Sequence, residues 1–299
     1  MPKKVLAIYY SQSGQLGEII DRFTEPLIRS GIAVEKLRIK PAVDYPFPWT
    51  GERFYSVMPD CVLGVTRDLA PFAFREPAYD LVILGYQAWF LFPGIPSNSL
   101  LQHPDFKAIV KNTPVITITG ARNMWLNAFE HVKKSLLDAQ AKLVGNIALV
   151  DKHPNIVSFV TIFHWLLGGK KDRYLNIFPT PGVSGADIAH ATTFGMLVLP
   201  HLQGDKWEGL QETLVRNHAV PWKYPLWLLE SKAIPTYTRW ARFIIKRKQR
   251  TAWLAVFKYY LLVALFLGAP ILLILDGIFI RPFSSRRINK KKQYYLALN

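Results

Sequence analysis

The pattern of apolar and polar residues divides the first half of the chain into short apolar runs and longer amphipathic stretches. Runs at 5–10, 34–40, 80–85, 114–119 and 143–150 predict five strands, and helical spacing of apolar residues predicts helices over 15–30, 125–141 and 185–202. The alternation of charged and apolar residues in 34–40 places that strand at or near a sheet edge. The order of elements predicts an α/β fold with a flavodoxin-like, doubly wound parallel sheet of five strands.

The loop after the first strand has the composition of a phosphate-binding turn. Ser11-Gln-Ser-Gly-Gln15 joins the strand to a helix, and Gly14 lets the backbone approach a ligand closely. The N-terminus of the following helix would direct free N–H groups and a positive dipole end at the same point. We therefore expect a phosphate cradle here. The alternative is an ordinary serine-rich turn that caps the helix.

Two further loops are expected at the same edge of the sheet, because all parallel strands end there. They span 85–93 and 119–125, and both carry glycine with aromatic or amide side chains. Such residues suit a flat ring with polar edges, such as isoalloxazine. A single phosphate cradle favours FMN over FAD. The predicted cofactor-binding residues are Ser11, Gln12, Ser13, Gly14, Gln15, Gly85, Tyr86, Gln87, Ala88, Trp89, Thr119, Gly120, Ala121, Arg122 and Asn123.

Two segments depart from this regular pattern. Residues 41–78 read as a long irregular stretch, rich in proline and aromatic residues, and such stretches in compact domains are functional or disordered. The many aromatic side chains argue against disorder. Residues 152–184 read as an insertion beside the fifth strand, which either forms a wall of a substrate pocket or only extends the core. We predict one flavodoxin-like domain over 1–230 and a basic, apolar tail over 231–299.

Composition, charge and residue spacing add four constraints. The net charge is +16, but residues 231–299 hold 14 of the 37 Lys and Arg residues against one acidic residue, Asp276. The basicity therefore belongs to the tail, and we expect no nucleic-acid partner. The one cysteine, Cys61, excludes an internal disulfide and fits a reducing compartment. The chain enters a strand at once, so we expect no signal peptide. The histidines lack metal-site spacing, and no metal is expected.

The tail has the character of a membrane-associating segment. Tyr259–Leu275 is free of charge over 17 residues and would span about 26 Å as a helix, slightly less than a bilayer core of roughly 30 Å. Cations flank it on both sides, which fits a single crossing poorly. Gly268-Ala-Pro270 would allow a kink or a re-entrant turn. We expect a cytoplasmic protein held on the inner membrane face; the alternative is a buried core helix.

These motifs resemble those of the flavodoxin-like superfamily over residues 4–150, although Leu16 stands where the family's phosphate loop often has a last hydroxyl. More narrowly, Ala7–Gln15, Gly85–Phe90, Thr119–Trp125 and the basic apolar tail resemble the dialkylresorcinol condensing enzyme (aromatase) family. The resemblance implies that a ketosynthase partner supplies a long-chain dialkylcyclohexane-1,3-dione and that this flavin-dependent oxidoreductase aromatises it to a resorcinol.

Aromatisation needs a hydride acceptor and a base or donor for the enolic ring. The catalytic candidates are Tyr86, Arg122, His164 and Tyr174, and the sequence does not rank them. Two other functions stay open. One is an NAD(P)H:quinone-type flavin reductase, with NAD(P) as the electron partner. The other is a cofactor-free membrane partner of a lipid or polyketide synthase.

Overall fold

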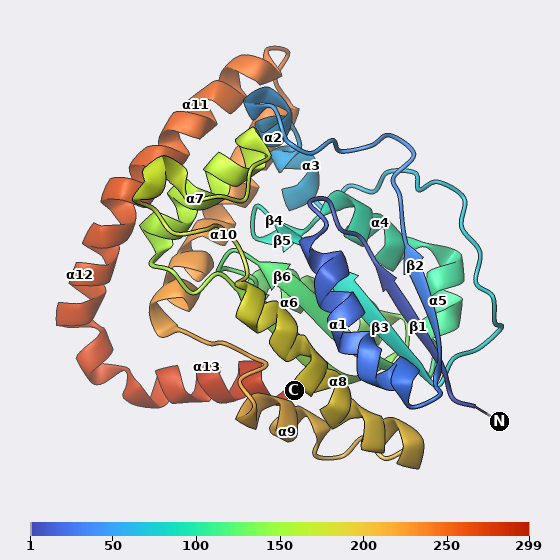
Figure 1. Cartoon of the computed structure of the whole chain (residues 1–299). Helices are drawn as coiled ribbons and strands as arrows, with labels where there is room; N and C mark the ends of the chain where they lie inside the picture. Colours follow the sequence, from blue (N-terminus) through green and yellow to red (C-terminus); the bar gives the residue numbers. More distant parts are fainter. Residues whose placement is uncertain (1, 299) are drawn as a thin grey trace.

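A parallel sheet forms the centre of the computed structural model, which describes residues 2–298 (Figure 1). Within those residues the sheet has the strand order β2-β1-β3-β6-β7. Its strands are β1 (Lys4–Tyr9), β2 (Ala33–Arg38), β3 (Leu81–Tyr86), β6 (Pro114–Ala121) and β7 (Lys142–Val150). All five predicted strands are confirmed, and β2 is an edge strand as its alternation indicated. This is the flavodoxin-like strand order. The strands stay parallel, but the direction in which successive strands are added to the sheet reverses between β1 and β3.

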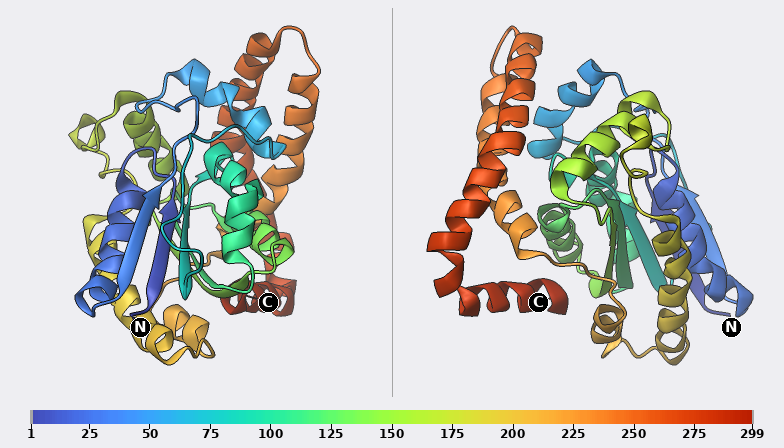
Figure 2. Two further views of the ribbon diagram at one scale, coloured as in Figure 1. Left: turned by 90° about the vertical axis from the view of Figure 1, so that its right-hand side faces the viewer. Right: turned by 60° about the vertical axis from the view of Figure 1, so that its left-hand side comes forward.

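Helices cover both faces of the sheet (Figure 2). On one face α1 (Gln15–Arg29) packs on α8 (Gly185–Gly204), with the apolar residues of α1 turned inward. The two helices approach closely at Gly195, where an added Cβ would lie 2.0 Å from the carbonyl oxygen of Phe23. The opposite face carries α4 (Ile95–Gln102), α5 (Pro104–Val110) and α6 (Leu126–Asp138). The predicted helices over 15–30, 125–141 and 185–202 are thereby confirmed.

Several short elements were not predicted. The stretch 41–78 is not irregular throughout, because it contains α2 (Gly51–Ser56) and α3 (Met58–Val62). Thr50 caps α2 by accepting a hydrogen bond from the Arg53 N–H. Helices α4 and α5 each carry proline in the first turn, which is favourable there but resembles a loop signal in sequence. A two-residue hairpin, β4 (Ala88–Trp89) with β5 (Phe92–Pro93), follows β3.

The segment 152–184 lies between β7 and α8, where the insertion was expected. It contains α7 (Asn155–Gly168) and the short helix η1 (Tyr174–Asn176). Asp151, at the end of β7, accepts hydrogen bonds from the His153 N–H and the Ser158 hydroxyl, at 2.9 and 2.8 Å. The buried carboxylate thus fixes the direction in which α7 leaves the sheet.

The C-terminal third is helical and packs against the rest of the chain. It comprises α9 (Leu210–Arg216), α10 (Tyr224–Ile245), α11 (Arg250–Val263), the π-helical η2 (Ala264–Gly268), α12 (Ala269–Phe279), η3 (Arg281–Phe283) and α13 (Ser285–Ala297). Helix α10 passes through residue 231, so the predicted domain boundary falls inside a helix. A second apolar cluster joins Met58 and Phe92 to Ile244 and Phe257. The C-terminal helices are therefore bound to the domain that carries the sheet.

Helices α11, η2 and α12 form one continuous helix, Arg250–Phe279. The chain makes no re-entrant turn at Gly268–Pro270. Pro270 has no N–H to donate, and the wider π turn just before it accommodates this loss without ending the helix. Among residues 2–298 this is the one helix long and apolar enough to cross a membrane, and 11% of its most apolar window is buried.

Candidate functional site

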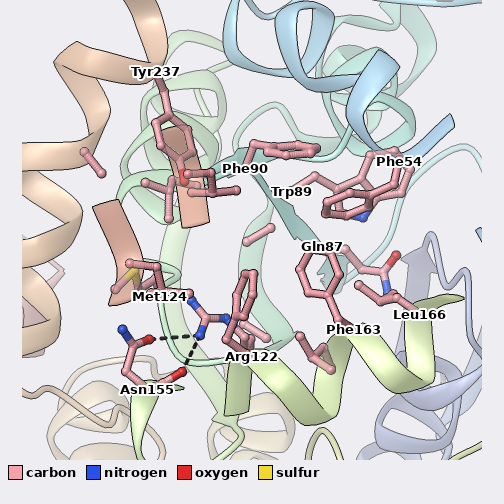
Figure 3. Close-up of a pocket in the computed structure, with 18 of the residues that line it drawn as sticks. Phe54, Gln87, Trp89, Phe90, Arg122, Met124, Asn155, Phe163, Leu166 and Tyr237 are labelled. Atoms are coloured by element: carbon pink, nitrogen blue, oxygen red, sulfur yellow. Dashed lines mark hydrogen bonds between the residues drawn. The ribbon is translucent and has the colours of Figure 1, made fainter. Parts of the chain in front are cut away.

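A cavity of about 440 Å³ lies between the carboxyl edge of the sheet and the C-terminal helices (Figure 3). It extends from the loop after β1 to the helix Arg250–Phe279. The sheet side contributes loop residues, and α7, α10 and the long helix contribute the remaining wall. The residues that line it include Gln12, Ser13, Gln15, Trp49, Gln87, Trp89, Gly120, Ala121, Arg122, Asn155, Phe159, Tyr237, Leu265, Gly268 and Leu272.

The loop 11–15 has the geometry of an anion cradle. Gly14 has φ of 90°, and nothing lies within 4 Å of the place where its Cβ would be. No side chain caps α1 at this residue, while the Ser11 hydroxyl, turned inward, accepts the Gly17 N–H at 3.2 Å. N–H groups at the start of the helix are thus left for a ligand beside an open backbone position.

The end of the 152–184 segment is attached to this loop. The Gln15 side-chain amide donates to the Val183 carbonyl at 3.2 Å, and its oxygen accepts the Val183 N–H at 3.1 Å. Gly182 is required beside it, because its φ is 80° and an added Cβ would lie 2.8 Å from Trp165. Lys171 Nζ lies 3.4 Å from the Val183 carbonyl oxygen. This lysine brings a positive charge close to the cradle.

Two indoles form an aromatic wall next to the cradle. Trp49 and Trp89 have ring centroids 5.5 Å apart and planes at 80°. The Trp49 indole N–H donates to the Gln12 side chain at 2.8 Å, which connects the aromatic segment 41–78 to the phosphate loop. An added Cβ at Gly94 would lie 3.0 Å from Trp89. The indole positions are therefore fixed by hydrogen bonding and close packing.

Arg122 is the main cationic group of the cavity. Its guanidinium donates to the Asn155 backbone oxygen at 3.0 Å and to the Asn155 side-chain oxygen at 2.9 Å. The Asn123 amide donates to the same side-chain oxygen at 3.1 Å. Burial lowers the pKa of Arg122 to about 10, so it stays protonated at neutral pH. The cavity therefore presents a fixed positive charge beside the sheet edge.

Helix α10 supplies two titratable groups near Arg122. Tyr237 lines the cavity, and burial raises the pKa of its phenol, which stays a neutral donor (Figure 3). Glu230 is 2% exposed, and one of its oxygens accepts the Asn127 N–H at 2.7 Å. Its other oxygen has no hydrogen-bond partner in the described part of the chain. Burial raises the pKa of Glu230 to about 7.

The four catalytic candidates are not brought together. Arg122 lines the cavity, whereas Tyr86 is fully buried on β3 and its hydroxyl has no partner among residues 2–298. His164 pairs with Asp172 at 2.7 Å and lies against the Tyr174 ring, with centroids 4.6 Å apart. Neither His164 nor Tyr174 is among the residues that line the cavity. The geometry thus separates His164 and Tyr174 from Arg122.

The predicted cofactor residues divide into two groups. Those that line the cavity are Gln12, Ser13, Gln15, Gln87, Ala88, Trp89, Gly120, Ala121 and Arg122. The others support the loops from behind. Thr119, for example, donates to the Tyr86 carbonyl at 2.9 Å, and at Gly85 an added Cβ would lie 2.6 Å from the Cβ of Tyr9. The other members of this group are Ser11, Gly14, Tyr86 and Asn123, of which Gly14 shapes the cradle itself.

Sequence reasoning missed the contribution of the C-terminal helices. Tyr237 and Glu230 lie on α10, which crosses the predicted boundary and places Tyr237 in the predicted tail. The long helix was expected to meet lipid rather than the cavity. One signal was available. Ala264, Gly268 and Ala269 repeat small residues on one side of an otherwise bulky apolar helix, and this side lines the cavity. Within the described residues no three His, Cys, Asp or Glu side chains are grouped as metal ligands.

Solved structures similar to this chain are flavoproteins and related folds. A flavoprotein in complex with FMN from Lactobacillus acidophilus is 16% identical, with 49% of this chain and 93% of that chain covered and a TM-score of 0.38. Flavodoxin 1 from Bacillus cereus is 16% identical, with 67% and 99% covered and a TM-score of 0.35. The Trp repressor binding protein from Bacillus subtilis is 11% identical, with 56% and 99% covered and a TM-score of 0.32.

No protein-family profile matches the sequence, and no curated protein matches it. The flavodoxin-like fold is established by the strand order of the sheet itself.

Proposed function

We propose that this chain is an FMN-dependent oxidoreductase that aromatises a long-chain dialkylcyclohexane-1,3-dione to a resorcinol. The observation that carries the proposal is one continuous cavity, which begins at an anion cradle and ends at an apolar helix. One end suits a phosphorylated flavin, and the other suits alkyl chains. The identity of the ring substrate comes from the resemblance of the loops to the dialkylresorcinol family.

The residues at the sheet edge fit FMN. The open backbone position at Gly14 and the first N–H groups of α1, apart from that of Gly17, suit the phosphate, with Lys171 nearby as a countercharge. The loops at 87–89 and 120–122, together with the Trp49–Trp89 wall, would hold the ring. A flavin held by these residues would supply the hydride acceptor for the oxidation. One cradle and no second phosphate loop favour FMN over FAD.

Arg122 and Tyr237 would bind the oxygens of the dione. The enolic dione carries negative charge on oxygen when it ionises, and a buried guanidinium stabilises that charge. The neutral phenol of Tyr237 can donate to the second oxygen. The dione loses one proton, released to solvent when it ionises, and one hydride, for which the flavin would be the acceptor. Tautomerisation of the resulting dienone gives the resorcinol, with no other atom transferred. Asn155, which fixes Arg122 through two hydrogen bonds, is a positioning residue.

The remaining wall would hold the alkyl chains and exclude water. Phe159 and Ile162 of α7 face the cavity together with Leu261, Leu265 and Leu272 of the long helix. Burial of methylene groups against such side chains contributes about 0.8 kcal/mol for each group. The 152–184 segment thus has the role of a substrate wall in this proposal.

We also propose where the protein is located and which enzyme supplies its substrate. The long helix is apolar and exposed, and Arg and Lys residues lie on either side of it in the sequence, which supports attachment to the inner face of an anionic membrane. The sheet domain would then lie in the cytoplasm. A ketosynthase that joins two acyl chains would supply the dione, as the family resemblance implies.

An NAD(P)H:quinone-type reductase is the second candidate. An apolar cavity next to a flavin would also accept a membrane quinone, and the exposed Lys232 at its edge offers a cation for a dinucleotide phosphate. This candidate uses NAD(P)H as the electron donor, whereas the first needs an electron acceptor. Product analysis therefore separates the two.

The test uses full-length protein purified in detergent. We expect FMN, and not FAD, to bind in a fluorescence titration, and a dialkylcyclohexanedione to yield the resorcinol with reduction of the flavin. NAD(P)H-dependent quinone reduction without resorcinol formation would decide for the second candidate. Protein that takes up no FMN would overturn both and favour a cofactor-free partner of a lipid synthase. Tyr237→Phe should lower turnover about tenfold, while Tyr260→Phe, also at the cavity, serves as its matched control.

A further inference from the structure

The long helix Arg250–Phe279 carries an unusual outer face. We define the outer face as ten apolar side chains, each at least 40% exposed: Val256, Tyr259, Val263, Phe266, Leu267, Ile271, Ile274, Leu275, Ile278 and Phe279. They recur every three or four residues and so form one continuous stripe. A contiguous apolar surface of this length marks a face that another apolar phase covers.

The opposite face of the same helix packs against the rest of the protein. Phe257 is fully buried in the second apolar cluster, and Leu265 is 9% exposed. The Phe266 ring, at the border of the two faces, lies 6.0 Å from Phe159 of α7. The helix therefore has two apolar faces with different partners. One face closes the cavity, and the other is exposed. The helix lies at the periphery of the molecule (Figure 2).

Both ends of the helix are attached to the same body. Near its C-terminal end, the buried Asp276 carboxylate accepts the Tyr224 hydroxyl at 2.9 Å. Beyond it, α13 turns back to the sheet domain (Figure 1). There the Tyr294 hydroxyl donates to Glu130 of α6 at 2.8 Å, and Gln211 of α9 donates to the Leu296 carbonyl at 3.0 Å.

These attachments are incompatible with a membrane crossing. A crossing helix would place α13 on the far side of the bilayer from α10, yet α13 contacts α6 and α9 of the sheet domain. The 30 residues of the helix would also rise about 45 Å, well beyond a hydrocarbon core of roughly 30 Å. The helix is thus held on one side of the body at three points, Phe257, Phe266 and Asp276.

We propose that the helix lies in the plane of the membrane, with its outer face in the lipid and its inner face on the cavity. This inference rests on the membrane location in the proposed function and specifies its geometry. The occupant of the outer face is an anionic bilayer. Arg247 and Lys248 precede the helix, and Arg286, Arg287 and Lys290–Lys292 follow it. Cations at both ends disfavour a crossing but suit a helix whose two ends meet the same headgroup layer.

The in-plane arrangement gives the cavity a lipid entrance. Gly268 lines the cavity and is itself exposed, in the middle of the helix. The cavity therefore reaches the molecular surface beside the outer face. A substrate with long alkyl chains would enter from the bilayer at this point, with its ring leading toward Arg122 and its chains still in lipid. No passage through water is needed.

The experiment measures the depth of the outer face in full-length protein bound to phosphatidylcholine–phosphatidylglycerol vesicles. Nitroxide labels are attached to single cysteines introduced by Val256→Cys, Val263→Cys, Ile271→Cys and Ile278→Cys. Native Cys61 is buried, and its thiol is not expected to react. Met196→Cys, on an exposed site of α8, is the matched control. Depth follows from the ratio of oxygen to nickel-chelate collision rates.

We expect all four outer-face labels at one shallow depth below the headgroups, and the control label in water. Lys248→Cys and Lys292→Cys, on either side of the helix, should both react with an impermeant maleimide added on the side of the sheet domain. A depth that is greatest at Val263 and Ile271, with one of the two lysine sites protected, would show a crossing and overturn the proposal. Labels that all remain in water would overturn it as well.

These readouts are independent of the proposed reaction. FMN uptake and resorcinol formation are measured in detergent, where the bilayer plays no part. Failure of those assays with a uniform shallow depth would leave the in-plane helix standing and remove the substrate assignment. An active enzyme whose helix crosses the bilayer would leave the substrate assignment standing and remove the in-plane helix.

Discussion

The two ends of the cavity are built in different ways. At the sheet end, short loops after β1, β3 and β6 present backbone N–H groups, amides and one guanidinium. At the helical end, α7, α10 and the helix Arg250–Phe279 present mainly apolar side chains, and the polar exceptions are Asn155, Lys232, Tyr237 and Tyr260. The sheet end therefore has the chemistry to fix charge, and the helical end has the chemistry to hold hydrocarbon. Substitutions at one end should leave the other end intact, which the following variants test.

The largest effect is expected for Gly14→Asp, which places a carboxylate in the cradle. Two unit charges about 4 Å apart repel by about 4 kcal/mol at a partly buried site, equal to about a 1,000-fold loss of FMN affinity. Gly31→Asp is the matched control, because Gly31 also has positive φ and open space but lies at the other end of α1. FMN titration compares the two. Equal losses would attribute the effect to backbone strain and contradict the cradle.

Arg122→Met removes the fixed charge between the two ends. We expect the kcat/KM for the dione to fall about 100-fold, as for the loss of a hydrogen-bond donor to a developing oxyanion. FMN affinity should change much less, since the loop 11–15 is untouched. Arg216→Met, at an exposed site on α9, controls for the loss of a cation. A variant with full turnover would remove Arg122 from the mechanism.

Glu230→Gln tests whether the buried Glu230 carboxyl, on α10 near the helical end of the cavity, is protonated in the folded protein. Because the pKa of Glu230 is raised from 4.5 to about 7, the folded protein holds a proton that the unfolded chain releases, so wild-type stability falls as the pH rises through this interval. The cost above pH 7 is roughly 3 kcal/mol. Gln mimics the neutral acid, so the variant should be more stable than wild type at pH 8 and similar near pH 4.5.

Denaturant unfolding at the two pH values measures this difference. Glu52→Gln, at an exposed site on α2, should change stability little at either pH. A wild-type protein whose stability does not fall between these pH values would show that Glu230 stays ionised in the fold.

The smallest effect is expected for Leu272→Trp, which narrows the cavity at the helical end. Overpacking there should cost about 1.5 kcal/mol for a long-chain dione, or about tenfold in KM, and leave a short-chain dione unaffected. Leu137→Trp, exposed on α6, is the control. Equal losses for both chain lengths would mean that Leu272 does not contact the chains.

The sheet end of the cavity could be predicted from the sequence, whereas the helical end could not. Local patterns identify the sheet end, because a buried parallel strand and the loop after it are adjacent in the chain, as Val5–Tyr10 and Ser11–Gln15 are. Strand order and right-handed crossovers then bring the three loops together. The prolines in α4 and α5 concealed two helices, since proline indicates both a loop and the first turn of a helix.

Local sequence patterns do not predict the helical end of the cavity. Tyr237 follows Arg122 by more than a hundred residues, and only long-range packing brings it to the cavity. The apolar run Tyr259–Leu275 reads as lipid-facing on every side, because a face that packs on protein and a face that contacts lipid use the same side chains. Small residues such as Gly268 distinguish the two faces only once the partner is known.

The reciprocal hydrogen bonds between Gln15 and Val183 have a kinetic consequence. The cradle and the segment before α8 share these two bonds, so a ligand that orders one also orders the other. In the proposed FMN complex, detachment of this segment would loosen the cradle, so that a local opening would contribute to the dissociation rate. Gln15→Ala should therefore accelerate release of bound cofactor more than it weakens equilibrium binding.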